Sequence, residues 1–420
     1  MESIELKYGK SHFFFNFDHA RFTVLRPPNE RPPLSDIEIG QRFDSPIGSP
    51  VLEDIVKAGE KVLIVVPDAT REVGCGQIVN LLVRRLIANG TEPYDISAIF
   101  ATGIHRPVTD DEKKAILTPF IFQRIRTIDH RPRELTGLER VGETRSGIKV
   151  ELNRALFEHD HVILVGGISF HYFAGFTGGR KLVCPGLASS RTISATHKLA
   201  FDCTIKARRA GVGTAMLDGN AVHEAFMEAT RLVDPSFAIN SIVNSSGEIT
   251  DIICGHWIAS HLEACREFDV RNLAAIQSKR DLVVASCGGS PHDINLIQAH
   301  KAIEAASMAC RDGGTIIVLA ECGDGLGRND FLNWFDSRTS REMADRLCES
   351  YQVNGQTAWS LREKTERFDI RIVTGISKQI IERMGMKYFE SLAAALVDIP
   401  DTDKGFIFPE GARLRVECED

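Results

Sequence analysis

Residues 62–66 read Val-Leu-Ile-Val-Val, a continuous apolar run that ends at Pro67-Asp68. Such a run predicts a strand buried on both faces, as in a parallel sheet covered by helices. Residues 78–87 follow with apolar side chains at helical spacing and end at Asn89-Gly90, which is typical of a helix C-terminus. Residues 96–100, Ile-Ser-Ala-Ile-Phe, predict the next strand. This order of strand, helix and strand predicts an α/β fold.

The same alternation continues along the chain and begins a second time near residue 275. Residues 161–165 predict a further buried strand of the first set. In the second set, strands are predicted at 281–286, 315–319 and 369–373, and helices at 298–310, 342–349 and 379–384. We therefore predict two α/β domains with largely parallel sheets covered by helices, at residues 1–272 and 273–404. The sequence allows the C-terminal strand within residues 405–420 to join the sheet of the first domain.

Composition limits the class of protein. The chain has 420 residues, of which 43% are apolar and 25% charged, as is ordinary for a folded globular protein. Its net charge is −7, from 50 basic and 57 acidic residues, whereas nucleic-acid-binding proteins usually carry a basic face. No apolar run reaches the roughly 18 residues of a membrane span, and the N-terminus does not resemble a signal peptide. We predict no nucleic-acid partner, no membrane association and a cytoplasmic location.

Ten cysteines are scattered along the chain without a CxxC pair. In a cytoplasmic protein, cysteines without such a pattern are usually reduced. We therefore expect free thiols at Cys75, Cys184, Cys203, Cys254, Cys265, Cys287, Cys310, Cys322, Cys348 and Cys418.

Polar segments closely follow several of the predicted strands. They are residues 68–71 (Asp-Ala-Thr-Arg), 102–105 (Thr-Gly-Ile-His), 169–171 (Ser-Phe-His) and 291–295 (Pro-His-Asp-Ile-Asn). Any one of them is more often an ordinary turn than a functional site. In open α/β sheets, however, binding sites lie at the carboxyl ends of the parallel strands. The recurrence of polar segments at equivalent places therefore predicts that they contribute to a site.

Residues 166–197 form the segment that is richest in reactive side chains. The glycines of its Thr177-Gly178-Gly179 loop permit positive φ and close backbone approach. Exposed N–H groups there, together with Arg180 and Lys181, are candidates to hold a phosphate. The segment is not a Walker loop, because Leu182 follows the lysine where that motif needs Ser or Thr.

Three histidines, His105, His171 and His197, bracket this segment. Imidazole binds zinc, copper, iron and nickel, and it also suits acid–base catalysis near neutral pH, so spacing alone does not choose between these roles. In the second set, Gln298 and Lys301 are three residues apart and share a helix face near a strand–loop–helix junction. From there they could reach a carboxylate, or they could face solvent.

Taken together, several ordered motifs resemble the lactate racemase family, the nickel-pincer-nucleotide enzymes. The most specific motif is residues 171–186, His-Tyr-Phe-Ala-Gly-Phe-Thr-Gly-Gly-Arg-Lys-Leu-Val-Cys-Pro-Gly, followed by His197. The others are residues 44–50 (DSPIGSP), 68–71 (DATR), 102–107 (TGIHRP) and 295–301 (NLIQAHK). The resemblance runs through most of the chain.

The resemblance implies a cofactor, a nicotinate-derived mononucleotide whose two sulfur-bearing arms bind nickel through S, C and S. Lys181 matches the lysine that tethers this cofactor covalently as a thioamide, and His197 matches the histidine that completes the square-planar nickel shell. The Thr177-Gly178-Gly179 loop is our own candidate for approaching the nucleotide phosphate. The first domain would then bind the cofactor, and separate biosynthesis enzymes would supply it.

The resemblance also implies which residues act on the substrate, a small 2-hydroxy acid. His105 and His171 match the two acid–base histidines. Arg71 matches a residue that binds the substrate carboxylate. Gln298 and Lys301, from the second domain, match residues with the same role, so we expect the active site in the interdomain cleft. Asp68 matches an acidic residue beside the site.

The implied reaction inverts the C2 stereocentre by reversible hydride transfer. Direct removal of the Cα proton is difficult because that carbon acid is very weak. Instead, one histidine takes the hydroxyl proton while the Cα hydride moves to the cofactor, and a planar 2-keto acid remains bound. Hydride returns to either face, so a base is expected on each side, which suits His105 and His171. The sequence leaves the stereochemical preference and the oligomeric state open.

Departures from the family pattern bear on the substrate. Ile297 stands where lactate-type members have a tyrosine, Glu72 follows the motif arginine in place of proline, and no tryptophan occurs at Gly355-Gln356. A wider and more polar pocket suits a substrate longer than lactate, such as a sugar acid. Two alternatives stay open: a zinc-dependent hydrolase that uses His105, His171 and His197, and a non-catalytic cofactor-binding protein.

Overall fold

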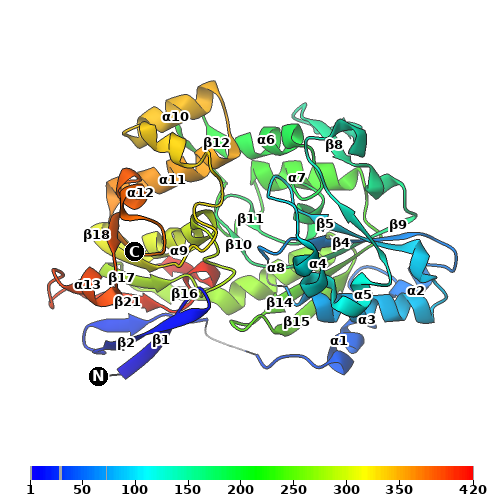
Figure 1. Cartoon of the computed structure of the whole chain (residues 1–420), viewed down its shortest axis with the longest axis horizontal. Helices are drawn as coiled ribbons and strands as arrows, with labels where there is room; N and C mark the ends of the chain where they lie inside the picture. The colour runs from blue at the N-terminus through cyan, green and yellow to red at the C-terminus, as the bar shows by residue number, and fades with distance from the viewer. Residues whose placement is uncertain (1, 28–30, 72, 420) are drawn as a thin grey trace. The chain divides into compact units, whose positions relative to one another are not determined.

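The computed structural model describes residues 2–27, 31–71 and 73–419. These residues fold into two compact units. Unit 1 is Met1–Asn29, Phe201–Arg209 and Asp269–Asp420, and unit 2 is Glu30–Ala200 and Ala210–Phe268. In each unit, helices pack against the faces of a central sheet (Figure 1).

Unit 2 is built on a mostly parallel sheet. In its described part, six strands lie in the order β15-β14-β9-β4-β5-β6, and β15 alone among them runs antiparallel to its neighbour. They are β4 (Val62–Pro67), β5 (Ile96–Ala101), β6 (Arg126–Asp129), β9 (His161–Gly167), β14 (Phe237–Val243) and β15 (Ile249–Gly255). All residues of β4 are buried, as its continuous apolar run predicts.

The helices of unit 2 cover this sheet and begin at recognisable caps. Ser35 and Thr109 each form a capping box with a glutamate three residues later, at the starts of α1 and α4. The helices are α1 (Asp36–Phe43), α2 (Leu52–Ile55), α3 (Cys75–Ala88), α4 (Asp110–Leu117), α5 (Pro119–Phe122), α6 (Ser190–Lys198), α7 (Ala221–Arg231) and α8 (Ala259–Asn272), whose last residues, from Asp269 on, belong to unit 1. Two small hairpins complete the unit, β7–β8 (Leu138–Glu143 and Lys149–Asn153) and β10–β11 (Phe170–His171 and Gly175–Phe176).

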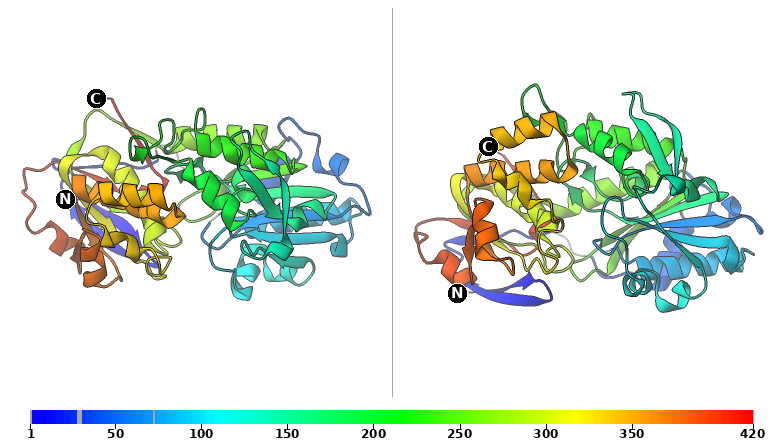
Figure 2. Two further views of the ribbon diagram at one scale, coloured as in Figure 1. Left: turned by 90° about the horizontal axis from the view of Figure 1, so that it is seen from above. Right: turned by 45° about the horizontal axis from the view of Figure 1, so that its top comes forward.

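Unit 1 has a parallel sheet of its own, in the order β20-β19-β18-β17-β21-β3 among the described residues. Its strands are β3 (Phe22–Val24), β17 (Arg280–Ser286), β18 (Cys310–Leu319), β19 (Asp369–Val373), β20 (Lys387–Phe389) and β21 (Gly405–Phe408). Its helices are α9 (Leu296–Ala309), α10 (Ser340–Glu349), α11 (Val353–Arg367), α12 (Lys378–Arg383) and α13 (Leu392–Leu396). Figure 2 shows α10 and α11 side by side, in agreement with their packing contacts.

Three strand pairs and several short 3₁₀ helices complete the chain. The strand pairs of unit 1 are β1–β2 (Glu2–Tyr8 and Ser11–Phe17), β12–β13 (Phe201–Asp202 and Ala207–Arg208) and β16–β22 (Leu273–Ile276 and Arg415–Cys418). The 3₁₀ helices are η1 (Pro93–Asp95), η2 (Leu135–Gly137), η3 (Arg154–Phe157), η4 (Gly179–Leu182), η5 (Leu332–Asp336) and η6 (Gly411–Arg413).

The α/β fold with largely parallel sheets is confirmed, but the chain is divided differently from the expected ranges 1–272 and 273–404. The first residues belong to unit 1, because Ile4, Leu6 and Phe17 pack into the same core as Leu282 of β17. The strand at Gly405–Phe408 does not return to unit 2, since it pairs with β17 and β3. A strand pattern identifies a strand but does not say which sheet it joins.

The expectation of ten free thiols is also wrong. Cys203 and Cys348 form a disulfide, with their Cα atoms 5.6 Å apart and the two residues 145 positions apart in sequence. Such a separation leaves no local motif from which the pairing could be predicted. Within the described ranges, no helix combines the length and the apolar character that crossing a bilayer requires.

Candidate active site

Three neighbouring parallel strands of unit 2 carry the candidate residues at their carboxyl ends. β4 leads into Asp68 and Arg71, β5 leads into the turn that ends at His105, and β9 leads through residues 168–169 to His171. Because β5, β4 and β9 are adjacent and parallel, these loops leave the same edge of the sheet. The sheet therefore brings together three of the four polar segments singled out in the sequence.

Asp68 and His105 form a hydrogen-bonded pair. The Nδ1 atom of His105 lies 2.6 Å from Oδ2 of Asp68, and Thr70 donates to Oδ1 from its hydroxyl at 2.6 Å and its backbone N–H at 3.0 Å. Burial alone would raise the pKa of Asp68, but the charges of His105 and Arg71 and these hydrogen bonds bring it well below its usual range. Asp68 is therefore ionised at neutral pH, while the His105 side chain stays 40% exposed and open to a ligand.

The hydrogen bonds of His171 favour the opposite tautomer from that of His105. The backbone N–H of Ala174 donates to its Nδ1 atom at 3.2 Å, so a neutral His171 ring carries its hydrogen on Nε2. In His105, by contrast, Nδ1 donates to the ionised Asp68, so the neutral ring has its lone pair on Nε2. The backbone and one carboxylate thus fix the two histidines in opposite tautomers.

Phe173 and Phe226 gather Lys181, His197 and His171 into one cluster. The Lys181 ammonium lies 5.8 Å from the centre of each phenyl ring. The His197 ring is 5.1 Å from Phe173 and 5.5 Å from Phe226, and the His171 ring is 4.4 Å from Phe173. Lys181 and His197 therefore share the same two aromatic neighbours, Phe173 and Phe226.

His197 is kept neutral. Burial, with the nearby charge of Lys181, lowers the pKa of His197 to about 3, against a weaker opposing effect of the Ile193 carbonyl. Its buried Nδ1 atom makes no hydrogen bond of good geometry within the described residues. His105 also contributes to lowering this pKa, which ties the Asp68–His105 pair to the Lys181–His197 cluster. A neutral imidazole is the form that binds a metal ion.

The buried Arg180 side chain holds the loop that carries these residues in place through hydrogen bonds. This fully buried side chain donates to the carbonyls of Ala174 at 2.7 Å and Thr177 at 3.2 Å, and to Nδ1 of His223 at 3.0 Å. Its guanidinium also lies 2.9 Å from Nε2 of His261. Burial lowers the pKa of Arg180 to about 10, so it remains charged. Arg180 therefore holds the loop and is not a phosphate ligand, contrary to the sequence-based suggestion.

Thr177, Gly178 and Gly179 are also built into this loop. The Thr177 hydroxyl donates to the Gly167 carbonyl at 2.9 Å and accepts from the Ser169 N–H at 2.8 Å. Gly178 and Gly179 both have positive φ, and a Cβ atom at Gly179 would lie 2.4 Å from the His261 ring. These residues shape the loop, and their predicted approach to a phosphate stays a prediction.

The remaining predicted residues lie on α9 of unit 1. The Asn295 side chain caps this helix by accepting from the backbone N–H of Gln298, whose own side chain is buried, and Lys301 follows one turn later.

Phe226, His223 and His261 could not be identified from the sequence as parts of the site, because they lie on α7 and α8 away from any motif. Phe173 lies within the motif at residues 171–186, but no role for it followed from the sequence. Among the described residues, His105, His171 and His197 do not gather into a three-ligand metal cluster, so the geometry gives the zinc alternative no support.

Comparison with known proteins matches both parts of the chain to one family. Residues 8–208 match the lactate racemase N-terminal domain, and residues 275–405 match the lactate racemase C-terminal domain. A lactate racemase of Thermoanaerobacterium thermosaccharolyticum is 33% identical over 353 residues, 83% of this chain and 81% of that protein. A lactate racemase of Lactiplantibacillus plantarum is 32% identical over 352 residues, 82% of this chain and 81% of that protein.

Solved structures agree. The lactate racemase apoprotein of T. thermosaccharolyticum gives a TM-score of 0.88 at 28% identity and covers 99% of this chain and 100% of its own. A protein of Thermotoga maritima gives a TM-score of 0.72 at 18% identity and covers 93% of this chain and 100% of its own, which shows a shared fold. The two domain matches and the relatives above 30% identity show that this chain belongs to the lactate racemase family.

Proposed function

We propose that this chain is a racemase or epimerase that inverts the C2 stereocentre of a 2-hydroxy acid. Its relatives are named lactate racemase, which places it in a family of isomerases. The observation that carries the proposal is the opposite tautomers of His105 and His171, in one cluster with Lys181 and His197. Inversion needs a proton acceptor on one side of the substrate and a proton donor on the other.

The residues present fit the nickel-pincer nucleotide that the resemblance implies. Lys181 would tether it, because its amine lies 5.8 Å from the centres of the Phe173 and Phe226 rings and near enough to His197 to lower the pKa of that ring. His197 would be the protein ligand of the metal, because burial keeps it neutral and its buried Nδ1 makes no hydrogen bond of good geometry among the described residues. When bound, this cofactor supplies an acceptor and donor for the hydride of the substrate Cα.

The chain's own groups would move the hydroxyl proton. The lone pair on Nε2 of His105 accepts it, and the ionised Asp68 stabilises the imidazolium that forms. His171 would donate from Nε2 to the substrate oxygen on the other side, while solvent takes up the proton of His105 and supplies one to His171, so that both rings end the cycle as they began. In the reverse direction the two exchange roles. Each would contribute about 10²–10⁴ in rate, the usual range for a positioned acid or base.

The substrate carboxylate would bind to Arg71, with Gln298 and Lys301 as further predicted ligands. The Arg71 guanidinium is close enough to Asp68 to affect its pKa, which puts a positive charge beside the proposed base. A guanidinium can hold a carboxylate through two parallel hydrogen bonds. Asp68 would then serve the site through His105 and would not contact the carboxylate itself.

We propose a substrate longer than lactate, such as a sugar acid. Trp334 and Trp359, which are near Gly355 in sequence, belong to the apolar core of unit 1, and the Trp334 ring lies where a Cβ atom at Gly355 would stand. Ile297 is partly buried against the same core. Glu72, the third departure from the family pattern, lies outside the described residues. A cytoplasmic location and maturation by cofactor-synthesis enzymes remain predictions.

One experiment tests this function. The full chain, produced with the cofactor-synthesis enzymes, is analysed by intact mass and metal content and then incubated with 2-hydroxy acids in D₂O. We expect a covalent adduct, nickel, and inversion of at least one acid with the original hydrogen kept at C2. Deuterium at C2 of the inverted product would overturn the hydride route. Zinc without an adduct would favour the hydrolase, and a loaded protein that inverts no 2-hydroxy acid would favour the cofactor carrier.

A further inference from the structure

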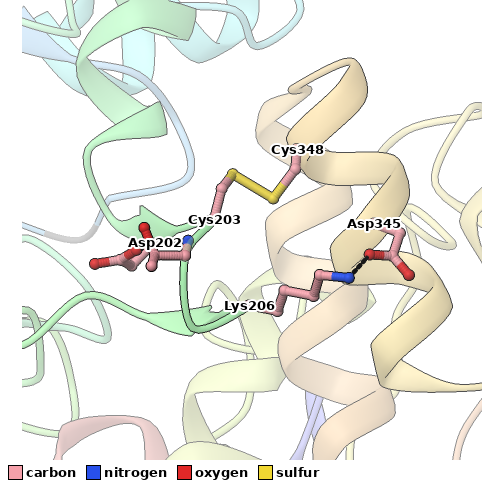
Figure 3. Close-up of a disulfide and its surroundings, with 6 residues drawn as sticks. Asp202, Cys203, Lys206, Asp345 and Cys348 are labelled. Carbon is pink, nitrogen blue, oxygen red and sulfur yellow. Dashed lines mark hydrogen bonds and ion pairs between the residues drawn. A yellow bond between two sulfur atoms is a disulfide. The ribbon is translucent and has the colours of Figure 1, made fainter.

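The hairpin β12–β13 carries a disulfide to helix α10 within unit 1. Cys203 begins the turn of the hairpin, and Cys348 lies in the last turn of α10 (Figure 3). Their Cα atoms are 5.6 Å apart, in the usual range for a disulfide. The same figure shows Lys206, on the other side of the turn, paired with Asp345 one helical turn before Cys348.

The base of this hairpin is held without the disulfide. Phe201 is buried, and its ring meets the Trp359 ring edge-on at 5.0 Å. Arg208, opposite Phe201 in the hairpin, pairs with the buried Glu304 at 2.8 Å. Glu304 also pairs with the buried Lys364 at 2.5 Å. Opening the disulfide would therefore leave both strands of the hairpin in place.

The turn at residues 203–206 has weaker support. Cys203, Thr204 and Ile205 are exposed, and the Lys206–Asp345 pair lies at the surface, where an ion pair contributes little. Lys206–Asp345 and the Cys203–Cys348 disulfide both join the turn to α10. The disulfide is thus the strong attachment of the turn.

The other cysteines differ in accessibility. Of the free cysteines in the described part of the chain, Cys418 is partly exposed and the rest are buried. Burial raises the pKa of Cys75 and Cys184 to about 12, which makes them poor nucleophiles. A dissolved thiol can therefore reach Cys203 and Cys348 in preference to the buried cysteines.

We propose that Cys203 and Cys348 form a redox-modification site, where exchange with a low-molecular-weight thiol such as glutathione opens and closes the disulfide. Opening releases the 203–206 turn from α10, and closing fastens it. In the reducing cytoplasm predicted for this chain, a disulfide within reach of such thiols is usually a reversible one. The proposal does not depend on the proposed racemase activity.

The exchange balances with glutathione as the reductant. A glutathione thiolate attacks one sulfur, which breaks the Cys203–Cys348 bond, forms a mixed disulfide and releases the other cysteine as a thiolate that takes a proton. A second glutathione thiolate attacks the glutathione sulfur of the mixed disulfide. This step frees the second cysteine and forms oxidised glutathione. The pair gains two electrons and two protons, which the two glutathione thiols lose, and closing follows the same steps in reverse.

The test equilibrates the full chain in oxidised and in reduced glutathione and then alkylates free thiols with N-ethylmaleimide. Peptide mass analysis should find the Cys203–Cys348 link in the oxidised sample and both cysteines alkylated in the reduced one. Hydrogen exchange on the same samples should show that residues 203–206 and the end of α10 lose protection in the reduced sample, with β12, β13, β17 and β18 unchanged. Free, alkylated Cys203 and Cys348 in the oxidised sample would overturn the proposal, as would equal exchange in both samples.

Matched variants separate the disulfide from the ion pair. Cys203→Ser, at an exposed position, should show the exchange of the reduced form in both buffers. Asp345→Asn removes the neighbouring ion pair and should keep the redox dependence. Cys418→Ser should keep it as well, because this cysteine lies outside the pair. Redox-dependent exchange that persists in Cys203→Ser would assign the effect to another group and overturn the proposal.

Discussion

The Nδ1 atom of His105 lies 2.6 Å from the carboxylate of Asp68, whose pKa is held well below its usual range by His105 and Arg71 against the opposing effect of burial. An ionised carboxylate can only accept a hydrogen bond, so this contact selects the tautomer of His105 and leaves its Nε2 atom able to take a proton. The Asp68–His105 pair thus leaves Nε2 of His105 as the nitrogen that can accept the substrate proton.

We predict that Asp68→Asn lowers kcat by about 10²–10⁴-fold, the range for loss of a positioned acid–base group. The amide can present its N–H to Nδ1 and favour the other tautomer of His105, so the base is lost although the side chain keeps its size. Steady-state racemisation of the loaded enzyme measures the effect. Asp54→Asn, at an exposed position on α2, is the control and should keep full activity. Wild-type kcat in Asp68→Asn would contradict the role of the pair.

We predict that His171→Ala abolishes inversion without loss of the bound cofactor. The variant removes the proposed proton donor but none of the residues proposed to hold the cofactor, Lys181 and His197. Intact mass should therefore match the loaded wild type, while inversion falls by about 10²–10⁴-fold. His256→Ala, at an exposed position, serves as the control. Unchanged turnover in His171→Ala would remove this histidine from the mechanism.

We predict that Lys181→Ala is recovered at the mass of the unmodified chain after incubation with the cofactor-synthesis enzymes. The lysine amine is the proposed point of attachment, and alanine offers no nucleophile. Lys198→Ala, an exposed lysine at the end of α6, should still take up the cofactor. An adduct of wild-type mass on Lys181→Ala would place the attachment elsewhere.

The buried strands of the fold could be predicted from the sequence because each is a continuous apolar run. β4, β5, β9, β17 and β19 all appear where their runs predict them. Helix α11 was not predicted, because it is mostly polar and contains Gly355, a weak helix former. The placement of residues 2–27 in unit 1 depends on which apolar surface the first hairpin covers, and periodicity carries no such information.

The sequence predicted which loops contribute to the candidate site, but it did not predict which of their side chains contact one another. Because parallel strands end at one sheet edge, Asp68, His105 and His171 were expected near one another. The hydrogen bond that pairs Asp68 with His105 joins residues 37 positions apart and has no sequence pattern. Phe226 brings Lys181 and His197 together from a helix with no recognisable motif.

We predict that Arg180→Leu destabilises the fold by about 2–4 kcal/mol, because it removes the buried, charged donor to the carbonyls of Ala174 and Thr177 and to Nδ1 of His223. Urea unfolding measures the change. The control is Arg191→Leu, an exposed arginine on α6, which should shift stability by no more than about 0.5 kcal/mol. An Arg180→Leu variant as stable as the wild type would show that the loop does not need the hydrogen bonds of the Arg180 guanidinium.

We predict that the chain loses stability as the pH falls from about 6.5, the ordinary histidine pKa. Burial lowers the pKa of His130 to about 4, and that of His197 and His223 to about 3. Between these values and 6.5, the unfolded chain binds protons that the folded chain does not. Each buried histidine then costs about 1.4 kcal/mol per pH unit. Stability is greatest above 6.5 and declines toward acid pH.

Urea unfolding at pH 7 and pH 5 measures whether the free energy of unfolding falls toward acid pH. Wild-type stability should be lower at pH 5, and His130→Gln should narrow the difference, because it removes one buried titrating group that contacts the Ala188 carbonyl and Asn153. His12→Gln, at an exposed position on β2, should leave the difference unchanged. Equal or greater stability at pH 5 would mean that these histidines are protonated in the folded chain, and a protonated His197 could not bind a metal ion.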